Sequence, residues 1–411
     1  MRILVLNSGS SSQKSCLYEL DTPLPDSPPA PLWEGKIEWQ GNRAVLDVRN
    51  SAGTTHKDEI TIGARSEATA RLLDALTSGK TRVLGDTSEI SAVGHRIVNG
   101  GSEYSQPTLI TPQVKVSIQR MAVFAPLHNR VELEGIGLIE KQFGAVRQIA
   151  VFDTGFHSQL PEAAAVYPGP YEWAARGIRR YGFHGINHQY CAGRTAQLLQ
   201  KSLSKLNLVT CHLGNGCSLA AIRNGQSIDT TMGFTPLEGL MMGTRSGSID
   251  PGILTYLLRE HHLTAEKLDD LLNTKSGLLG ISGISGDMRQ IVSAMKGGNA
   301  RAKLACDIFV HRLQAGIGAM IAALGGLDAL VFTAGIGENS PEVREMACAN
   351  FRFMGVTLDP LKNASPHLDQ EISGPGSTVR VLVLRAQEDW AIARECWKLA
   401  SDSSARQSPA S

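Results

Sequence analysis

The feature that most constrains this chain is a strand–turn–strand pattern that occurs twice, at the N-terminus and near the middle. Residues 206–222, LNLVTCHLGNGCSLAAI, place a glycine-containing turn between two apolar, β-prone runs. Residues 3–6 form a similar apolar run, followed by the small residues of NSGSSSQK. Aligning Gly9 with Gly214 gives an offset of 214 − 9 = 205 in a chain of 411 residues. We therefore expect two similar halves.

Both turns are suited to phosphate. Glycine lets the main chain approach a ligand closely and leaves N–H groups free to point at an anion. Two such turns that face each other could clamp one polyphosphate. For HLGNG alone, an ordinary Gly-Asn hairpin turn is an equally good interpretation.

Composition excludes several classes of protein. The chain is 42% hydrophobic and 19% charged, as expected for two or three soluble domains. Its net charge of +1, without Lys/Arg runs, argues against a nucleic-acid partner. Seven scattered cysteines without a CxxC pair indicate neither disulfides nor a zinc site, which favours a cytoplasmic location. The apolar stretch Ala315–Leu327 is too short and glycine-rich to span a bilayer, so no membrane partner is expected.

Ionisable residues follow several apolar runs. Arg96 lies inside the run ISAVGHRIV near its C-terminal end, Asp153 follows residues 148–152, and residues 180–188 read RYGFHGINH. In open α/β sheets ligands bind at the carboxyl ends of strands, so these residues are candidates for one site. Two alternatives remain open: Arg96 can be a structural ion-pair member, and any single histidine can be a structural one.

Other segments predict the surrounding elements. Alternating patterns predict strands near residues 36–39 and 44–48, and apolar spacing predicts helices at 66–75 and about 300–324. The long glycine-rich segment 229–250, which contains Arg245, is expected to be a functional loop. Residues 334–341, AGIGENSP, predict a glycine turn that leads into a helix capped by Ser340 and suited to a nucleotide.

These segments together resemble the acetate and propionate kinase family of the actin, sugar-kinase and Hsp70-like superfamily. The match runs from Asn7 to Arg394 and is carried, in order, by NSGSSSQK, GHRIVNGG, APLHN, FDTGFH, YGFHGINH, CHLGNG, MGFTPLEGLMMGTRSGSIDP, SGDMR, FTAGIGENSPEVR and AQEDWAIAR. Four places depart from the family's usual wording, at Asn99, at Arg130, in residues 386–389 and at Trp390, which is bulkier than the common leucine. The change in residues 386–389 alters the neighbours of Glu388.

The resemblance implies an α/β protein of two actin- or ribonuclease H-like domains, each on a mixed five-stranded sheet with flanking helices, and an active site in the interdomain cleft. Residues 1–150 would form the acyl-substrate and phosphate domain, and 151–387 the nucleotide-binding domain. A final helix near 388–400 would pack back on the first domain. The tail 401–411 is expected to be disordered. Family members are homodimers.

The resemblance also assigns roles. It implies that Mg²⁺, for which Mn²⁺ can substitute, is held by Asn7 and Glu388. The residues implied in catalysis are Asp153, His184, Arg245 and Arg96. The substrate would contact Arg96, Val98, Leu127, Phe183 and Pro236. ATP or ADP would contact Lys14, His212, Leu213, Gly214, Asn215, Gly216, Asp287, Met288, Arg289, Gly335, Ile336, Gly337, Glu338 and Asn339.

The implied reaction is direct in-line transfer of a phosphoryl group from ATP to acetate, which gives acetyl phosphate and ADP reversibly. Propionate or another short-chain acid is the alternative acceptor, because one methylene in an apolar pocket changes binding only modestly. An ATP-dependent switch and an ATPase share the phosphate turns. Neither class requires Arg96, Arg245 and His184 together with a methyl-sized pocket.

Overall fold

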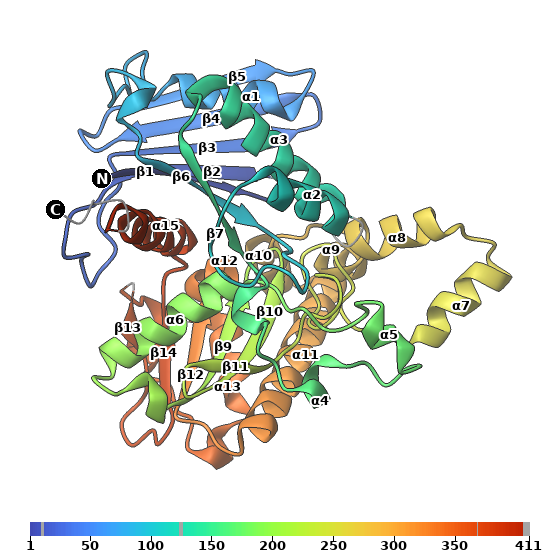
Figure 1. Ribbon diagram of the computed structural model, residues 1–411. Helices are drawn as coiled ribbons and strands as arrows, with labels where there is room; N and C mark the ends of the chain where they lie inside the picture. Colours follow the sequence, from blue (N-terminus) through green and yellow to red (C-terminus); the bar gives the residue numbers. More distant parts are fainter. Residues whose placement is uncertain (10–11, 123–125, 368, 406–411) are drawn as a thin grey trace. The chain divides into compact units, whose positions relative to one another are not determined.

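The chain forms two compact units, each with its own sheet. The computed structural model describes residues 1–9, 12–122, 126–367 and 369–405 (Figure 1). Unit 1 comprises Met1–Gly155 together with Gln387–Ser411, and unit 2 comprises Phe156–Ala386. The sequence predicts boundaries after residues 150 and 387, whereas the structure has them after 155 and 386. The end of the chain therefore belongs to the same unit as its beginning.

Unit 1 is built on an eight-stranded sheet with the order β5-β4-β3-β2-β1-β6-β8-β7. Its first five strands in the chain form an antiparallel meander, while β1, β6 and β8 are parallel neighbours. The strands are β1 (Arg2–Ser8), β2 (Ser12–Glu19), β3 (Trp33–Gln40), β4 (Arg43–Asn50), β5 (Thr55–Thr61), β6 (Ala92–Ile97), β7 (Thr108–Leu109) and β8 (Arg147–Phe152).

Unit 2 is built on a six-stranded sheet with the order β11-β10-β9-β12-β14-β13. The hairpin β9–β10 carries the central turn, with Leu213 opposite Cys217, and β9, β12 and β14 run parallel. The strands are β9 (Asn207–Leu213), β10 (Cys217–Arg223), β11 (Gln226–Thr230), β12 (Ala329–Thr333), β13 (Gln370–Glu371) and β14 (Arg380–Val383).

The two sheets contain the same five-strand arrangement. The arrangements are β3-β2-β1-β6-β8 and β11-β10-β9-β12-β14, in order across each sheet. In both, the middle strand has two antiparallel strands on one side and two strands parallel to it on the other. This repeat confirms the expected duplication. The expectation of only five strands per sheet was wrong, because β4, β5 and β7 extend the first sheet and β13 extends the second. In β4, alternate residues such as Leu46 and Val48 join the core, which makes a half-buried strand favourable.

Helices cover both faces of the unit 1 sheet. Leu72 of α1 and Ile139 of α3 pack with Val93 of β6 in one hydrophobic cluster. Gly94 follows Val93 in β6, so a Cβ at this position would point to the opposite face of the sheet, where α15 packs against β1 and β6. The helices of this unit are α1 (Arg65–Asp74), α2 (Pro112–Met121), α3 (Pro126–Phe143) and α15 (Glu388–Ala405).

Helix α15 is longer than the sequence predicts. Its buried residues include Trp390, Ile392 and Cys396, so an apolar stripe holds it on the sheet. The expectation of disorder from residue 401 was wrong for its first part, because the helix continues to Ala405. Residues 406–411 lie outside the described residues.

Helix α11 (Ala300–Leu324) is the longest apolar element of unit 2. By length and composition alone this helix could cross a membrane, so the expectation that its apolar stretch is too short to span a bilayer does not hold for the whole helix. The helix packs against β10, α9 and α10, and a Cβ at Gly316 would lie 2.8 Å from Leu219 Cδ1. These contacts are those of a core helix.

The other helices of unit 2 are mostly short. They are α4 (Glu162–Ala165), α5 (Glu172–Ala175), α6 (Gly185–Leu198), α7 (Pro251–Glu260), α8 (Ala265–Thr274), α9 (Gly277–Ser282), α10 (Met288–Lys296), α12 (Ala334–Asn339), α13 (Pro341–Ala349) and α14 (Pro360–Ala364). Asp250 caps α7 as predicted, because its Oδ1 accepts from the Gly252 N–H at 2.8 Å. Ser340 precedes α13 but makes no side-chain cap.

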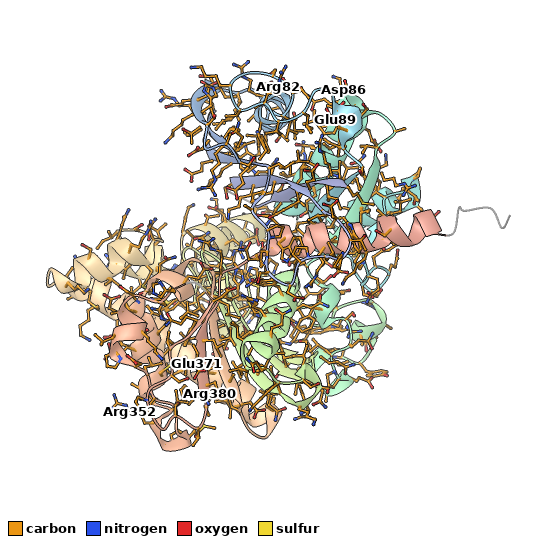
Figure 2. All side chains as sticks on the ribbon, turned by 90° about the vertical axis from the view of Figure 1, so that its left-hand side faces the viewer. Arg82, Asp86, Glu89, Arg352, Glu371 and Arg380 are labelled. Carbon is orange, nitrogen blue, oxygen red and sulfur yellow. The ribbon has the colours of Figure 1, made fainter. Side chains whose placement is uncertain are left out.

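Exposed polar pairs hold local geometry at the surface (Figure 2). Asp86 and Glu89 form a capping box around the short 3₁₀ turn Thr87–Glu89. Glu371 and Arg380 form a 2.8 Å ion pair between β13 and β14. Because both side chains of this pair are substantially exposed, it stabilises the fold by at most about 1 kcal/mol. The apolar core therefore dominates stability.

The contact between β6 and α15 predicts a stability effect at Gly94. A Cβ there would lie 2.6 Å from Cys396 Sγ and 2.7 Å from Ile392 Cγ2, so Gly94→Ala must displace α15. We expect the free energy of unfolding in urea to fall by about 1–3 kcal/mol. Gly137→Ala on α3 is the control, because no atom lies within 4 Å of its added Cβ. Equal unfolding midpoints for the two variants would contradict the packing argument.

Candidate active site

In unit 1, the end of β1 meets the start of α15. Asn7 Nδ2 lies 3.0 Å from both Glu388 Oε2 and Asp389 Oδ1. Lys14, opposite Asn7 in the β1–β2 hairpin, adds a positive charge nearby. Burial raises the pKa of Asp389, an effect that the charge of Lys14 and the hydrogen bond from Asn7 oppose. The first and last segments of the chain thus share one polar cluster.

This cluster fits a magnesium ion. Mg²⁺ takes oxygen ligands and keeps several waters, so it needs only one or two protein oxygens. Two carboxylates beside a side-chain amide provide them, and rotating the Asn7 amide by half a turn would present its oxygen instead of its nitrogen. In the described part of the chain no group of three His, Cys, Asp or Glu residues could hold a metal. A water-rich site is therefore the type that these residues could form.

Arg96 and Asp153 lie at the ends of the neighbouring strands β6 and β8. Arg96 Nη2 donates to Asp153 Oδ2 at 2.7 Å, and Nη1 donates to the Ser8 carbonyl at 3.4 Å. The Arg96 side chain is 12% exposed and that of Asp153 is fully buried. Arg96 is thus an ion-pair member, one of the two interpretations that the sequence left open. The pair fixes the guanidinium at the carboxyl edge of the sheet.

Glu132 on α3 is a buried acid that sequence reasoning missed. Its Oε1 accepts from the Val98 N–H at 3.1 Å. Burial raises its pKa to about 8, although the positive charge of Arg96 opposes this shift. Leu127 lies on the same helix, and its side chain is outside the described residues. Glu132 therefore anchors the backbone of one predicted substrate contact, Val98.

In unit 2, two histidine rings stack at the central turn. His184 is left-handed, with φ of 57°, at the start of α6, and His212 lies in β9. Their centroids are 3.9 Å apart and their planes differ by 7°. A Cβ at Gly216 would lie 3.3 Å from His184 Nε2 and 3.6 Å from Arg245 Nη1. Glycine at this position allows the turn to approach both side chains.

The glycine-rich segment 229–250 packs around this turn. Arg245 Nη1 donates to the Pro236 carbonyl at 3.0 Å, and the Gly243 N–H donates to the Asn215 carbonyl at 3.0 Å. Phe183 is buried, and its carbonyl lies 3.1 Å from His157 Nε2. The structure therefore brings Phe183, His184, Pro236 and Arg245 close to the turn at residues 212–216.

The two predicted nucleotide segments lie at helix starts. Asp287 caps α10 by accepting from the Arg289 N–H, and it also pairs with the exposed Arg289 guanidinium, which lowers the pKa of Asp287. Met288 is buried. Residues 335–339, predicted as a turn, form most of the short helix α12. That prediction was wrong because Ala334, with φ of 64°, makes the reversal before the glycines.

Arg344 on α13 is a second residue that sequence reasoning missed. Its side chain is fully buried, and its Nη1 donates to the carbonyls of Gly337 and Glu338 at 2.8 and 2.9 Å. A guanidinium that donates to carbonyl groups holds the C-terminal end of α12 in place. The sequence contains one signal for Arg344: it is the arginine of ENSPEVR and lies within the pattern of an amphipathic helix.

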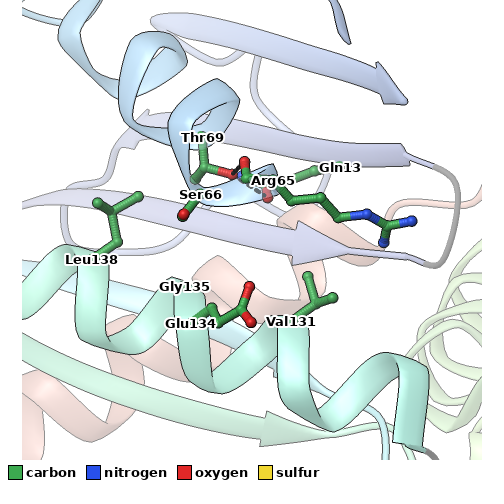
Figure 3. A pocket seen from close by; sticks show the side chains of 8 residues that line it. All are labelled: Gln13, Arg65, Ser66, Thr69, Val131, Glu134, Gly135 and Leu138. Carbon is green, nitrogen blue, oxygen red and sulfur yellow. Dashed lines mark hydrogen bonds between the residues drawn. The ribbon is translucent and has the colours of Figure 1, made fainter. Parts of the chain in front are cut away.

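A small cavity in unit 1 lies between α1 and α3. Gln13, next to Lys14, lines it with Arg65, Ser66, Thr69, Val131, Glu134, Gly135 and Leu138 (Figure 3). Its volume of about 10 Å³ is close to that of one water molecule. Gln13 Oε1 already accepts from Ser8 and Thr69. This cavity is therefore too small for acetate or a nucleotide.

Comparison with known proteins identifies the family. A sequence model described as the Acetokinase family matches residues 2–394. The chain belongs to the acetokinase family. Among family members it is 60% identical over 404 residues to the acetate kinase of Gloeobacter violaceus, covering 97% of this chain and 99% of that protein. It is 56% identical over 402 residues to the acetate kinase of Trichormus variabilis, again covering 97% and 99%.

Two solved structures have the same fold as this chain. The crystal structure of Porphyromonas gingivalis acetate kinase matches with a TM-score of 0.88 and 40% identity, covering 97% of this chain and 99% of that one. A propionate kinase from Francisella tularensis matches with a TM-score of 0.87 and 36% identity, covering 96% and 98%. These comparisons confirm the family resemblance and the α/β fold class.

The buried acid predicts a pH effect on stability. The pKa of Glu132 is raised from 4.5 to about 8, so the folded state binds more protons between these values. Stability from this group is therefore lost as pH rises through that window. Glu132→Gln cannot ionise and still accepts from Val98. We expect its free energy of unfolding, relative to wild type, to increase by roughly 2–4 kcal/mol between about pH 5 and pH 8.

Glu134→Gln is the matched control, because Glu134 lies on the exposed side of the same helix. Urea unfolding of the three proteins at both pH values measures the effect. A constant difference between Glu132→Gln and wild type would show that Glu132 does not titrate in this range.

Proposed function

We propose that the protein is an acetate kinase, which transfers the γ-phosphoryl group of ATP to acetate and catalyses the reverse reaction. The observation that carries this proposal is the membership of nearly the whole chain in the acetokinase family, with relatives named acetate kinase at 56–60% identity. The described side chains have the chemistry that the reaction requires.

Phosphoryl transfer requires positive groups more than it requires covalent chemistry. An acetate oxygen attacks the γ-phosphorus in line, the bond to the β–γ bridging oxygen breaks, and ADP leaves with that electron pair. Negative charge spreads over the three equatorial oxygens. Arg96, Arg245 and His184 are donors held by their neighbours before substrate arrives, which is the arrangement that stabilises such charge.

The acceptor needs no general base. Simple carboxylic acids are ionised at neutral pH, so acetate enters as the nucleophile. Asp153 is already the 2.7 Å partner of Arg96 and is fully buried. We therefore assign Asp153 to orienting the guanidinium rather than to proton abstraction.

ATP would be held mainly by unit 2 and the metal by unit 1. The turn at residues 212–216 offers backbone N–H groups to the phosphates, α10 and α12 flank the adenosine, and Lys14 adds charge. Asn7 and Glu388 would hold Mg²⁺ or Mn²⁺, with Asp389 beside them. When bound, the ion neutralises charge on the phosphate oxygens.

The acyl pocket would be lined by Val98, Leu127, Phe183 and Pro236. One additional methylene changes selectivity by only about 1–3 kcal/mol in such a pocket. The propionate kinase among the structural neighbours makes propionate the alternative acceptor. Acetate is the proposed substrate because both relatives at 56–60% identity are named acetate kinase.

A substrate panel tests this function. ADP release from ATP and Mg²⁺ is measured with acetate, propionate, butyrate or no acid. We expect acetate to give the highest kcat/KM, propionate to be accepted less well, and release without acid to be negligible. A preference for propionate would keep the mechanism and change the substrate, whereas acid-independent release would indicate an ATPase.

A homodimer is proposed from the family and from α7. This helix, labelled α7 in Figure 1, has no buried residue. It exposes Ile253, Tyr256 and Leu258 by 45%, 56% and 38%. Ile253 and Tyr256 are three residues apart and so share one face of the helix, and exposed apolar side chains on one face are typical of a surface that another chain covers. The pairing of α7 with a second copy would bury them.

Light scattering tests the dimer. We expect the double variant Ile253→Asp/Tyr256→Asp to have the mass of a monomer, because two buried charges would cost several kcal/mol. Leu361→Asp is the control, since this residue is 85% exposed on α14. The α7 surface is not the interface if the double variant keeps the mass of wild type.

We also propose a cytoplasmic location without nucleic-acid or membrane partners. All seven cysteines are buried and free of disulfides, which suits a reducing compartment. A net charge of +1 provides little overall attraction for the phosphate backbone of a nucleic acid.

A further inference from the structure

Behind His184, three buried side chains form a continuous hydrogen-bonded chain. His184 Nδ1 lies 2.8 Å from Ser218 Oγ, and Ser218 Oγ lies 2.8 Å from His188 Nε2. His188 Nδ1 in turn lies 2.7 Å from Thr210 Oγ1. Ser218, His188 and Thr210 are fully buried. Among the described residues, the two histidines are the only side-chain partners of the Ser218 hydroxyl, so this hydroxyl donates to one histidine and accepts from the other, which leaves two arrangements of protons.

His188 carries only one ring proton. Burial, together with the nearby His157 and His212, lowers its pKa well below the ordinary value. A neutral imidazole donates from one nitrogen and accepts at the other. The direction of the chain therefore decides which nitrogen of His188, and hence which nitrogen of His184, carries the proton.

In the first arrangement each group donates its hydrogen bond in the direction of His184. Thr210 donates to His188 Nδ1, His188 Nε2–H donates to Ser218, and Ser218 donates to His184 Nδ1. Neutral His184 then carries its proton on Nε2. The hydrogens of the Thr210 hydroxyl, of His188 Nε2 and of the Ser218 hydroxyl then each have an acceptor within the chain.

In the second arrangement each group donates its hydrogen bond away from His184. His184 Nδ1–H donates to Ser218, Ser218 donates to His188 Nε2, and His188 Nδ1–H donates to Thr210. The Thr210 hydroxyl hydrogen then needs another acceptor, and among the described residues His188 Nδ1 is its only side-chain hydrogen-bond partner. A buried donor without an acceptor costs about 1–3 kcal/mol. The first arrangement is therefore favoured.

We propose that Thr210, His188 and Ser218 are positioning residues that hold His184 as its Nε2–H tautomer, so that this N–H donates to the transferring phosphoryl group. The position of the ring supports this role, because Nε2 and Arg245 Nη1 both converge on Gly216 at the phosphate turn. The other tautomer would present a lone pair to anionic oxygens. The inference rests on the proposed kinase function.

The stacked neighbour of His184 is held in the same way. Asn187 Nδ2 donates to His212 Nδ1 at 2.8 Å, which leaves Nε2 of His212 to carry the proton. With the rings 3.9 Å apart and nearly parallel, the two Nε2–H groups lie on neighbouring rings. The protein thus offers a pair of preset donors at the turn and does not need to reorganise them during the reaction.

Nitrogen NMR of the full chain labelled with ¹⁵N-histidine tests the tautomer without any assay of activity. His184 is assigned by the loss of its signals in His184→Asn. We expect wild type to show a protonated Nε2 and an unprotonated Nδ1 on His184, and Ser218→Ala to show a mixture of tautomers. A protonated Nδ1 on neutral His184 in wild type would overturn the proposal.

Kinetics supply a second test. We expect Ser218→Ala and Thr210→Val to lower kcat roughly 10- to 100-fold with little change in KM. Thr195→Val is the control, because its buried hydroxyl donates to the Cys191 carbonyl outside the chain. His188→Gln keeps one donor and one acceptor and should retain more activity than His188→Leu.

Two outcomes of the kinetics would contradict the proposal. One is an equal loss for Thr210→Val and Thr195→Val, and the other is an equal loss for both His188 variants. If wild type shows no acetate-dependent turnover, the proposed function fails, and the NMR spectrum still decides the tautomer.

Discussion

The structure of unit 1 depends on the contact between Asn7 and the two acids that begin α15. One amide at the end of the first strand reaches Glu388 and Asp389, which are more than three hundred residues away in the chain. The contact sets where α15 begins. Below it, Trp390, Ile392 and Cys396 cover the face of the sheet that α1 and α3 leave open. The same helix thus contributes acids to the polar cluster and apolar side chains to the core.

Local patterns in the sequence predicted the elements well. The turn at residues 212–216, the strands near residues 36–48 and the cap at Asp250 are confirmed because each depends on residues close together in the chain. The prediction of a turn at residues 335–339 was wrong because it, too, relied only on neighbouring residues. The glycines there suggest a turn, whereas packing against β12 and hydrogen bonds from Arg344 stabilise a short helix.

The groups that the sequence did not reveal are buried and polar. Glu132 binds a backbone N–H 34 residues away, and the hydroxyl of Ser218 joins two histidines 30 and 34 residues away. No periodicity marks such residues, since a buried acid or serine looks like an exposed one in the sequence. Only the fold supplies their partners. The family motifs, by contrast, identify residues at the strand ends directly, and these are the residues that the structure places at the ends of β1, β6, β8 and β9.

The discontinuity of unit 1 has a consequence for synthesis on the ribosome. Unit 2 is a single continuous stretch and has all its strands once residue 386 has emerged. Most of unit 1 is translated before unit 2, but α15 follows unit 2 in the sequence, so the apolar face around Gly94 stays uncovered until α15 has been synthesised. We expect the nascent first domain to need a chaperone during that interval, and deletion of α15 to harm the first domain rather than the second.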